Sequence, residues 1–492
     1  MRKTIGRAGL CLSVLAVCAF TASADDTGSV WAKRRAQYPE LTGIYDLAES
    51  VPAPLRALAL LRIATAPGMK DTGWKKELLT EAFSAAAQAP TLWPTTSVMP
   101  AASAAGKSSV RAKKLETSND HNPGLLRLTL QTDIVETMLS VDRAEAVSMF
   151  NQIAPLGMPV LTCSDGLMPD VASYYGAATV IAKGGFSDEQ KKNGDPVQFL
   201  RTLMVAISSP VETKPAATML PGLGLAPDDT ISVVSDFASR LENLSGDDRS
   251  FFADLDGTSK AVLSLADSLP DSLANVVLKA WRNYLIQNLT GDRCRETVDT
   301  KWHYSKSAMD VIDAFNARVA GRESVAPIDK DDIHPGSVAS GSAYASRVQL
   351  SAAERDLQSR WFAIEFGNQP DGLSNEQKSD PEWIANFDKY LDDIADLKPS
   401  DGESEADAWQ HKCTLMHQAI MAAPPGPLTD RVIAQYVQLL QLNTISLERI
   451  SSWYSEVTSF LSAADVLNHA RGVALRAMEA SDTPLLMLVA KM

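Results

Sequence analysis

Side chains that commonly bind metal ions lie close together near residue 411. Cys413 and His417 are four positions apart, so a helix would place them on one face, where a nitrogen and sulfur pair suits zinc or copper. His411 lies two residues before Cys413 and would sit off that face. Because zinc sites use three or four protein ligands, we expect no bound metal or cofactor. The alternative is a helix with one buried cysteine and two partly exposed histidines.

Two groups of acidic residues could bind cations or basic partners. The first, in a polar loop, could hold a hard cation or be solvated linker charge; it consists of Asp329, Asp331, Asp332 and His334. The second lines one face of a predicted helix at spacings of four: Asp388, Asp392 and Asp396. A solvated acidic face is the ordinary explanation of this second group, and a docking face for a basic partner is the alternative.

Motifs of common enzymes are absent or incomplete. The chain has no His-Glu-x-x-His helix and no Gly-x-Ser-x-Gly elbow. Gly106-Lys107-Ser108 resembles the end of a phosphate-binding loop, but Ala101 replaces its first glycine. Asp254-x-Asp256-Gly257 resembles part of a calcium loop, but Phe252 and Leu263 stand where carboxylates are required. We expect this last segment to cap the helix that follows.

One short segment carries an enzyme resemblance. Gly166-Leu167-Met168-Pro169 is similar to the Gly-Leu-Met-Gln segment of exported lytic transglycosylases, which place a catalytic domain on an α-helical superstructure. The resemblance implies a buried glutamate, followed by serine, that acts as an acid on a polymer of the cell envelope. Pro169 replaces the glutamine, and the upstream Glu136 and Glu145 are followed by threonine and alanine. A hydrolase or lyase of this kind is therefore the alternative function.

The first 24 residues have the layout of a cleaved secretory signal. A short basic start is followed by the apolar run Ala8–Phe20 and by Ala22-Ser23-Ala24, which predicts cleavage after Ala24. No later apolar stretch is long enough to span a bilayer. We therefore expect a secreted or periplasmic protein without a transmembrane segment.

Charge and cysteine content narrow the class of protein further. The net charge is −14, and loss of three basic residues with the signal makes it −17. This excess of acid argues against nucleic-acid binding and against docking on an anionic membrane. Cleavage leaves Cys163, Cys294 and Cys413, which permit one disulfide of unknown pairing or three buried thiols.

The dominant pattern along the chain is helical. Apolar residues recur at spacings of three and four over many segments, which indicates amphipathic helices joined as hairpins. The predicted helices are Pro54–Thr65, Trp74–Ala89, Leu125–Leu139, Arg143–Ile153, Asp170–Lys183, Pro196–Ile207, Asp229–Leu244, Ser259–Leu269, Asp271–Leu289, Lys306–Val319, Ala352–Phe366, Pro381–Leu397, Glu405–Ala422, Leu428–Leu442, Leu447–Ala463 and Asp465–Ala480.

Helix-end signals support several of these segments. Capping-box spacings occur at Ser187-x-x-Gln190, Ser351-x-x-Glu354 and Ser374-x-x-Gln377. Glycines follow three predicted helices, where a left-handed residue is favoured: Gly291, Gly321 and Gly367.

Irregular segments divide the predicted helices. Pro90–Asn122 contains the one basic cluster and indicates a mobile insertion, and Thr213–Asp228 indicates an irregular connection with three prolines. We expect a signal peptide at 1–24, N-terminal hairpins at 25–155 with the insertion 90–122, a middle helical region at 156–320, a linker at 321–350 and a C-terminal helical lobe at 351–492.

The hairpins also resemble helical-repeat proteins. In Ala146-x3-Phe150-x2-Ile153-x-Pro155, the small residue and the aromatic and aliphatic residues after it resemble the second helix of a tetratricopeptide-type repeat. The resemblance covers about two helix pairs, lacks the Trp-Leu-Gly pattern of the first helix, and no fixed repeat length runs through the chain. We predict an all-α fold of stacked hairpins in an irregular α-solenoid with two lobes; generic all-α packing is the alternative.

These observations favour binding over catalysis. We expect an exported, non-catalytic helical scaffold or binding protein of the cell envelope, whose partner is another envelope protein or an envelope polymer. The alternatives are the envelope-polymer hydrolase or lyase described above and a metal-binding protein.

Overall fold

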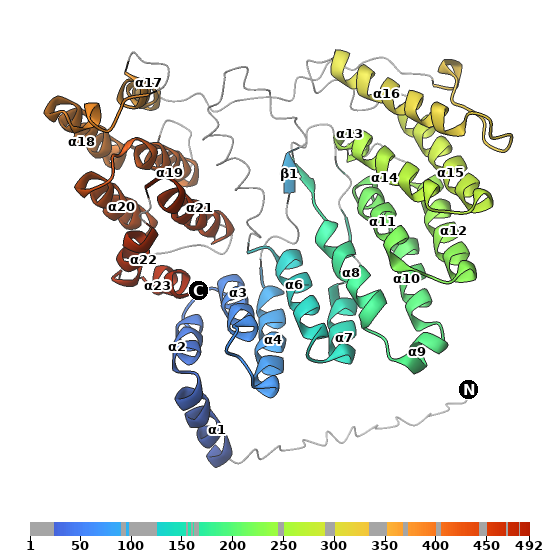
Figure 1. Cartoon of the computed structure of the whole chain (residues 1–492), viewed down its shortest axis with the longest axis horizontal. Helices are drawn as coiled ribbons and strands as arrows, with labels where there is room; N and C mark the ends of the chain where they lie inside the picture. The colour runs from blue at the N-terminus through green and yellow to red at the C-terminus, as the bar shows by residue number, and fades with distance from the viewer. Residues whose placement is uncertain are drawn as a thin grey trace, which may run out of the picture. The chain divides into compact units, whose positions relative to one another are not determined.

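Helices dominate the computed structural model of the protein (Figure 1). The structure describes residues 24–492 except 90–94, 98–124, 154–155, 159–160, 162–166, 245–249, 291–300, 334–351, 368–371, 400–404, 442–449, 469–470 and 482. The predicted all-α class of stacked hairpins is confirmed. The predicted signal 1–24 lies outside the described residues, apart from Ala24, and remains a prediction.

The chain divides into two units, Met1–Gly43 and Ile44–Met492. Helix α1 (Ala24–Gln37) lies in the first unit, and α2 (Pro39–Ala48) begins there. In this unit the guanidinium of Arg35 lies 5.9 Å from the ring centre of Trp31. Neither α1 nor α2 was among the helices predicted from the sequence.

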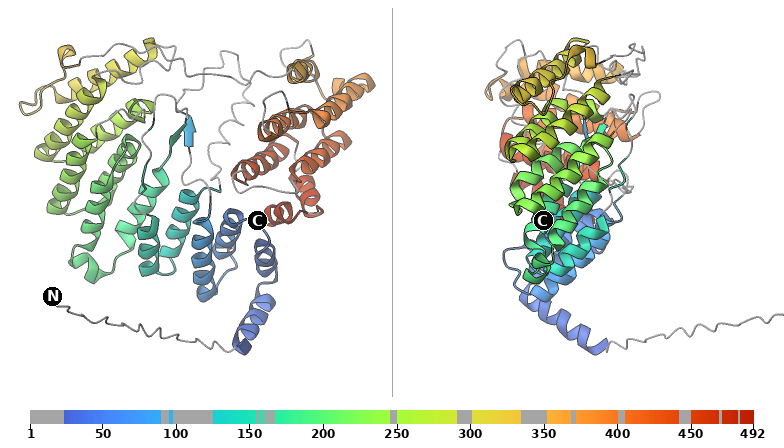
Figure 2. Two further views of the ribbon diagram at one scale, coloured as in Figure 1. Left: turned by 180° about the vertical axis from the view of Figure 1, so that it is seen from behind. Right: turned by 90° about the vertical axis from the view of Figure 1, so that its right-hand side faces the viewer.

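Antiparallel hairpins follow one another along the first part of the second unit (Figures 1 and 2). Their helices are α3 (Ala53–Thr65), α4 (Thr72–Ala86), α6 (Arg127–Leu139), α7 (Arg143–Ile153), α8 (Ala172–Gly184), α9 (Asp188–Lys192), α10 (Asp195–Ala206), α11 (Thr213–Met219), α12 (Pro227–Asn243), α13 (Ser250–Ala253), α14 (Leu255–Asp267), α15 (Asp271–Leu289) and α16 (Lys301–Val319).

These helices form two layers. In one layer, α6 contacts α8, α8 contacts α11, α11 contacts α14, and α14 contacts α16. In the other layer, α10 contacts α12, and α12 contacts α15. The apolar stripe on α15 is the reason for this packing, because Val277, Trp281 and Tyr284 are almost fully buried against neighbouring helices. Each hairpin therefore covers the apolar face of the next, as expected for a helical-repeat architecture.

A second run of hairpins occupies the C-terminal part of the chain. It consists of α17 (Ala352–Phe366), α18 (Pro381–Asp396), α19 (Glu405–Ala422), α20 (Pro427–Leu440), α21 (Ile450–Asn468), α22 (Arg471–Glu479) and α23 (Pro484–Lys491). Two layers form again. Helix α17 contacts α19 and α19 contacts α21 in one layer, and α20 contacts α22 in the other.

Within the described parts of the chain, short strands interrupt the helices at one place. Strand β1 (Thr95–Ser97) pairs antiparallel with β2 (Leu167–Pro169), and Thr96 is opposite Met168. The rest of the predicted insertion 90–122 lies outside the described residues.

The expectation of an irregular connection over Thr213–Asp228 was wrong. The segment contains α11, the 3₁₀ helix η2 (Leu220–Leu223) and the start of α12, and it follows another 3₁₀ helix, η1 (Pro210–Glu212). Pro221 and Pro227 lie in the first turns of η2 and α12, and at the start of α12 the missing N–H group of Pro227 has no partner to lose.

Several predicted helix ends are confirmed. Ser187 and Gln190 form a capping box, and Gln377 N–H donates to Ser374 Oγ at 3.3 Å in another. Gly321 and Gly367 have positive φ angles of 81° and 54° just beyond α16 and α17. Gly291 and the serine of the third predicted capping box lie outside the described residues.

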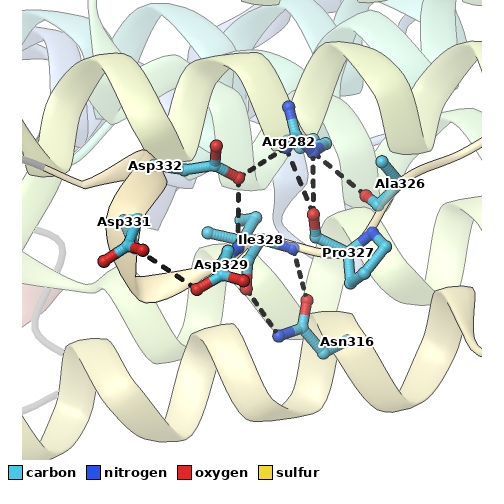
Figure 3. Close-up of polar contacts among 8 residues, drawn as sticks. All are labelled: Arg282, Asn316, Ala326, Pro327, Ile328, Asp329, Asp331 and Asp332. Atoms are coloured by element: carbon cyan, nitrogen blue, oxygen red, sulfur yellow. Dashed lines mark hydrogen bonds and ion pairs between the residues drawn. The ribbon is translucent and has the colours of Figure 1, made fainter.

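The first part of the predicted linker 321–350 is packed against α15 and α16 (Figure 3). Arg282 of α15 donates to the carbonyl oxygens of Ala326 and Pro327 at 3.0 to 3.2 Å, and it pairs with Asp332 at 2.7 Å. Asn316 of α16 exchanges two hydrogen bonds with the backbone of Ile328. The chain is therefore fixed as far as the short helix η3 (Lys330–Asp332), and residues 334–351 lie outside the described part.

Among the described residues, no helix combines the length and the apolar content that crossing a membrane would need.

Candidate functional site

A pocket lies among α8, α11 and α14, with a cavity volume of about 550 Å³. This volume is within the range of sites that hold small organic ligands. The walls come from the segment that leads into α8, from η1 through η2, and from the start of α14. Because these segments belong to successive hairpins, the pocket is formed by the packing of one hairpin on the next.

Most of the pocket wall is apolar. Its apolar side chains are Met168, Pro169, Val171, Ala172, Pro210, Val211, Pro215 and Met219. The prolines fix their own backbone angles and so make the wall rigid, whereas methionine side chains adapt to different ligand shapes. Gly222 leaves space at the wall, since a Cβ atom placed there would meet nothing within 4 Å.

Three charged side chains also line the pocket. Lys214 Nζ lies 2.5 Å from Asp254 Oδ2, and Asp254 also caps α14 by accepting the N–H of Gly257 at 3.2 Å. This cap confirms the role expected for the Asp254 segment. Asp170 accepts the N–H of Ala172 at 2.9 Å and so begins α8. Both carboxylates therefore order the helix starts that shape the pocket.

A buried carboxylate joins two walls of the pocket from behind. Glu212, only 3% exposed, lies at the end of η1, and its Oε2 accepts the N–H groups of Ser208 and Ser209 at 2.7 and 3.0 Å. Its Oε1 accepts the hydroxyl of Tyr175, from α8, at 3.1 Å. Burial raises the pKa of Glu212 above its ordinary value, and these hydrogen bonds counteract part of that effect.

One carboxylate of α6, that of Glu136, lies close to Gly176 of the pocket wall, and Asp133 lies on the same helix. Glu136 Oε1 lies 4.0 Å from the position that a Cβ atom on Gly176 would take. Burial and the Glu136 carboxyl raise the pKa of Asp133 to about 6, although Arg62 acts in the opposite direction. Partial burial also raises the pKa of Glu136. Glu136 therefore places an acidic group next to the pocket wall at Gly176.

We expect Asp133→Asn to stabilise the hairpins around α6 at high pH. The raised pKa means that ionised Asp133 is disfavoured in the folded state above about pH 6, and that this cost disappears as the pH falls toward the unfolded value of 3.8. After allowance for partial exposure, the gain should be about 1–2 kcal/mol at pH 8 and well under 1 kcal/mol at pH 4.

Hydrogen exchange of α6 amides at the two pH values measures this effect. Asp310→Asn, at an exposed position of α16, is the matched control and should change neither value. A gain for Asp133→Asn that is equal at pH 8 and pH 4 would contradict the assigned pKa.

The metal-ligand candidates lie on α19 and do not form a metal site among the described residues. Cys413 is a fully buried free thiol, and burial raises its pKa well above the ordinary value, so it is not poised to bind a metal or to react. His411 is partly exposed. His417 Nε2 lies 2.7 Å from Glu456 Oε1 of α21. Cys163 and Cys294 lie outside the described residues.

Glu456 is the centre of a buried polar cluster in the C-terminal hairpins. Its carboxylate accepts the hydroxyl of Tyr436 and, at 2.9 Å, the amide N–H of Gln410. Burial alone would raise the pKa of Glu456, but His417, Tyr436 and Gln410 together lower it below the ordinary value. The cluster ties α19, α20 and α21 together.

The two acidic groups are largely occupied by contacts within the chain. In the loop, Asp332 pairs with Arg282 and accepts the N–H of Asp329 at 3.0 Å (Figure 3). On α18, Arg431 from α20 pairs with Asp388 at 2.6 Å and reaches Asp392 at 3.4 Å. These contacts give the acidic residues structural roles; Asp396 remains exposed, and His334 lies outside the described residues.

The residues behind the transglycosylase resemblance are spread over different elements. Leu167 to Pro169 form β2, and Met168 and Pro169 line the pocket. Glu145, in the first turn of α7, lies 3.9 Å from Lys76 and does not line the pocket. Glu145 therefore does not take the place of the buried acid glutamate that the resemblance implies.

Sequence reasoning missed the pocket and Glu212. Asp170, Lys214 and Asp254 lie on three separate segments, so no local spacing connects them. A usable signal was present at Ser209-x-x-Glu212, which has the capping-box spacing and forms that box in the structure.

The fold and the pocket define an all-α protein of stacked helical hairpins with a ligand-sized cavity between successive hairpins. No protein-family model, no curated protein and no solved structure matches the chain.

Proposed function

We propose that this chain is an exported, non-catalytic binding protein of the cell envelope and that its binding site is the pocket among α8, α11 and α14. The observation that carries the proposal is the preformed apolar cavity of about 550 Å³. The signal layout of residues 1–24 supports export.

The state of the pocket carboxylates favours binding over catalysis. Glycoside hydrolysis needs one carboxylic acid kept protonated and a second carboxylate free to act on the sugar. Asp254 is instead paired with Lys214 and caps a helix, and Asp170 accepts the N–H of Ala172 at the start of another helix. Glu212 is held by hydrogen bonds behind the wall. Because these carboxylates are engaged in an ion pair and in hydrogen bonds, they suit a rigid binding site better than a catalytic pair.

A pocket-filling variant tests the proposal. Gly222→Phe would place a phenyl ring at an open position of the pocket wall, and Gly68→Phe places the same ring at an exposed loop position that is equally open. The probe is Nile red, a neutral apolar dye whose fluorescence rises in apolar surroundings. We expect saturable binding to the wild type and to Gly68→Phe, and at least tenfold weaker binding to Gly222→Phe.

Equal dye binding by all three proteins, or none by the wild type, would contradict the proposed site. Circular dichroism of each protein checks that the helices are retained, so that loss of binding reports on the pocket.

A further inference from the structure

The charged groups of the pocket do not cancel one another. Lys214 is engaged by Asp254 at 2.5 Å, which leaves Asp170 as the remaining charge on the wall. Asp170 accepts one backbone N–H, and no ion pair joins it to a cation of the described residues. The lining therefore carries a net charge of about −1, located where α8 begins.

The surroundings strengthen the negative potential in the cavity. Glu212 lies directly behind the wall at Val211, and Glu136 approaches Gly176 from α6. Apolar walls keep the local dielectric constant low, so the field of these carboxylates is screened less than it would be at an open surface. An anionic ligand would meet repulsion here, and a neutral one would gain a hydrogen bond from Asp170 without the attraction between opposite charges.

The rest of the pocket fits an apolar body. Met168, Val171 and Met219 offer flexible or branched aliphatic contact, and the ring of Tyr175 lines the same cavity. An aromatic ring also attracts a cation placed over its face. The cavity volume suits a ligand of ordinary small-molecule size.

We propose that the natural ligand is a small organic cation, with an apolar body in the pocket and an ammonium or guanidinium group paired with Asp170. This inference rests on the proposed binding function and adds the chemical class of the ligand. Asp170 would act as the specificity-determining residue, because it is the pocket carboxylate without a competing lysine.

Matched ligands test the charge preference. 4-Phenylbutylamine, 4-phenylbutanol and 4-phenylbutyrate share an apolar body and differ in the charge of one end. Each is used to displace Nile red from the full-length protein. We expect the amine to bind the wild type about fivefold more tightly than the alcohol, and the carboxylate to bind least tightly.

Two substitutions should move the preference in opposite directions. Asp170→Asn removes the charge but keeps a side-chain oxygen that can accept the N–H of Ala172, so the amine should lose its advantage over the alcohol. Lys214→Met frees Asp254 from its partner, so the advantage of the amine should increase. Asp380→Asn, which changes the cap of α18, is the matched control and should behave as the wild type. General damage to the fold cannot produce changes of opposite sign.

The outcomes separate this inference from the proposed function. Dye binding that is blocked by Gly222→Phe, together with equal affinities for amine and alcohol, would overturn the cationic ligand and leave the binding function in place. Absence of dye binding would overturn both. An acetylated and amidated Phe-Lys dipeptide provides the same chemistry from a protein source, and tighter binding of it than of the amine would overturn the small-molecule ligand.

Discussion

Glu456→Ala is expected to destabilise the C-terminal hairpins by about 3–5 kcal/mol, because removal of one member of a buried polar cluster leaves the others unpaired. The hydroxyl of Tyr436, which is fully buried, would lose its acceptor, and so would the amide of Gln410. Hydrogen exchange of amides in α19, α20 and α21 measures the loss locally, which avoids treating a protein of many hairpins as a two-state unit.

The same cluster predicts a pH dependence. The folded-state pKa of Glu456 lies below its ordinary value of 4.5, so its charge stabilises the fold above that pH. This contribution is lost as the pH falls through the folded-state pKa. The stability difference between the wild type and Glu456→Gln should therefore be largest near pH 6.5 and smaller at pH 4. A difference that increases on acidification would show that the assigned direction is wrong.

Glu212→Ala should be nearly as costly, about 2–4 kcal/mol, and its effect should be confined to the pocket region. The substitution leaves the backbone N–H groups of Ser208 and Ser209 and the hydroxyl of Tyr175 without their buried acceptor. Glu212→Gln should cost about 1 kcal/mol or less, because its carbonyl oxygen can accept the two N–H groups and the Tyr175 hydroxyl can turn to accept from the amide.

Hydrogen exchange of α8 and α11 distinguishes these variants. Glu189→Ala, at an exposed position of α9, is the control for loss of a glutamate and should leave exchange unchanged. Protection in Glu212→Ala equal to that of the wild type would mean that the carboxylate does not hold the two helices together.

The helices were predictable because each carries its own signal. The stripe containing Trp281 on α15 and the one containing Tyr436 on α20 are buried as their spacing predicts. The helices that were not predicted lack such a stripe or are short. Helix α11 contains a proline, and α23 begins at Pro484, shortly after the predicted end of the preceding helix at Ala480. The sequence alone does not distinguish a proline at the start of a helix from a proline in a loop.

The pocket could not be predicted in the same way. Its charge balance depends on Lys214 meeting Asp254, forty residues away along the chain, and Asp170 being left over. Such a pairing follows from how hairpins stack, which local periodicity does not determine. The opposite happened with His411, Cys413 and His417. Their local spacing suggested a metal site, but Cys413 lies in the core and His417 lies against Glu456.

The position of the pocket at the junction of hairpins has a thermodynamic consequence. In helical-repeat proteins, stability is approximately the sum of a term for each repeat and a coupling term for each neighbouring pair. Helices α8 and α14 each contact α11, and all three contribute to the pocket. A bound ligand would therefore add to the coupling terms on both sides of α11. Occupancy of one small cavity would then make several hairpins unfold as a single cooperative block.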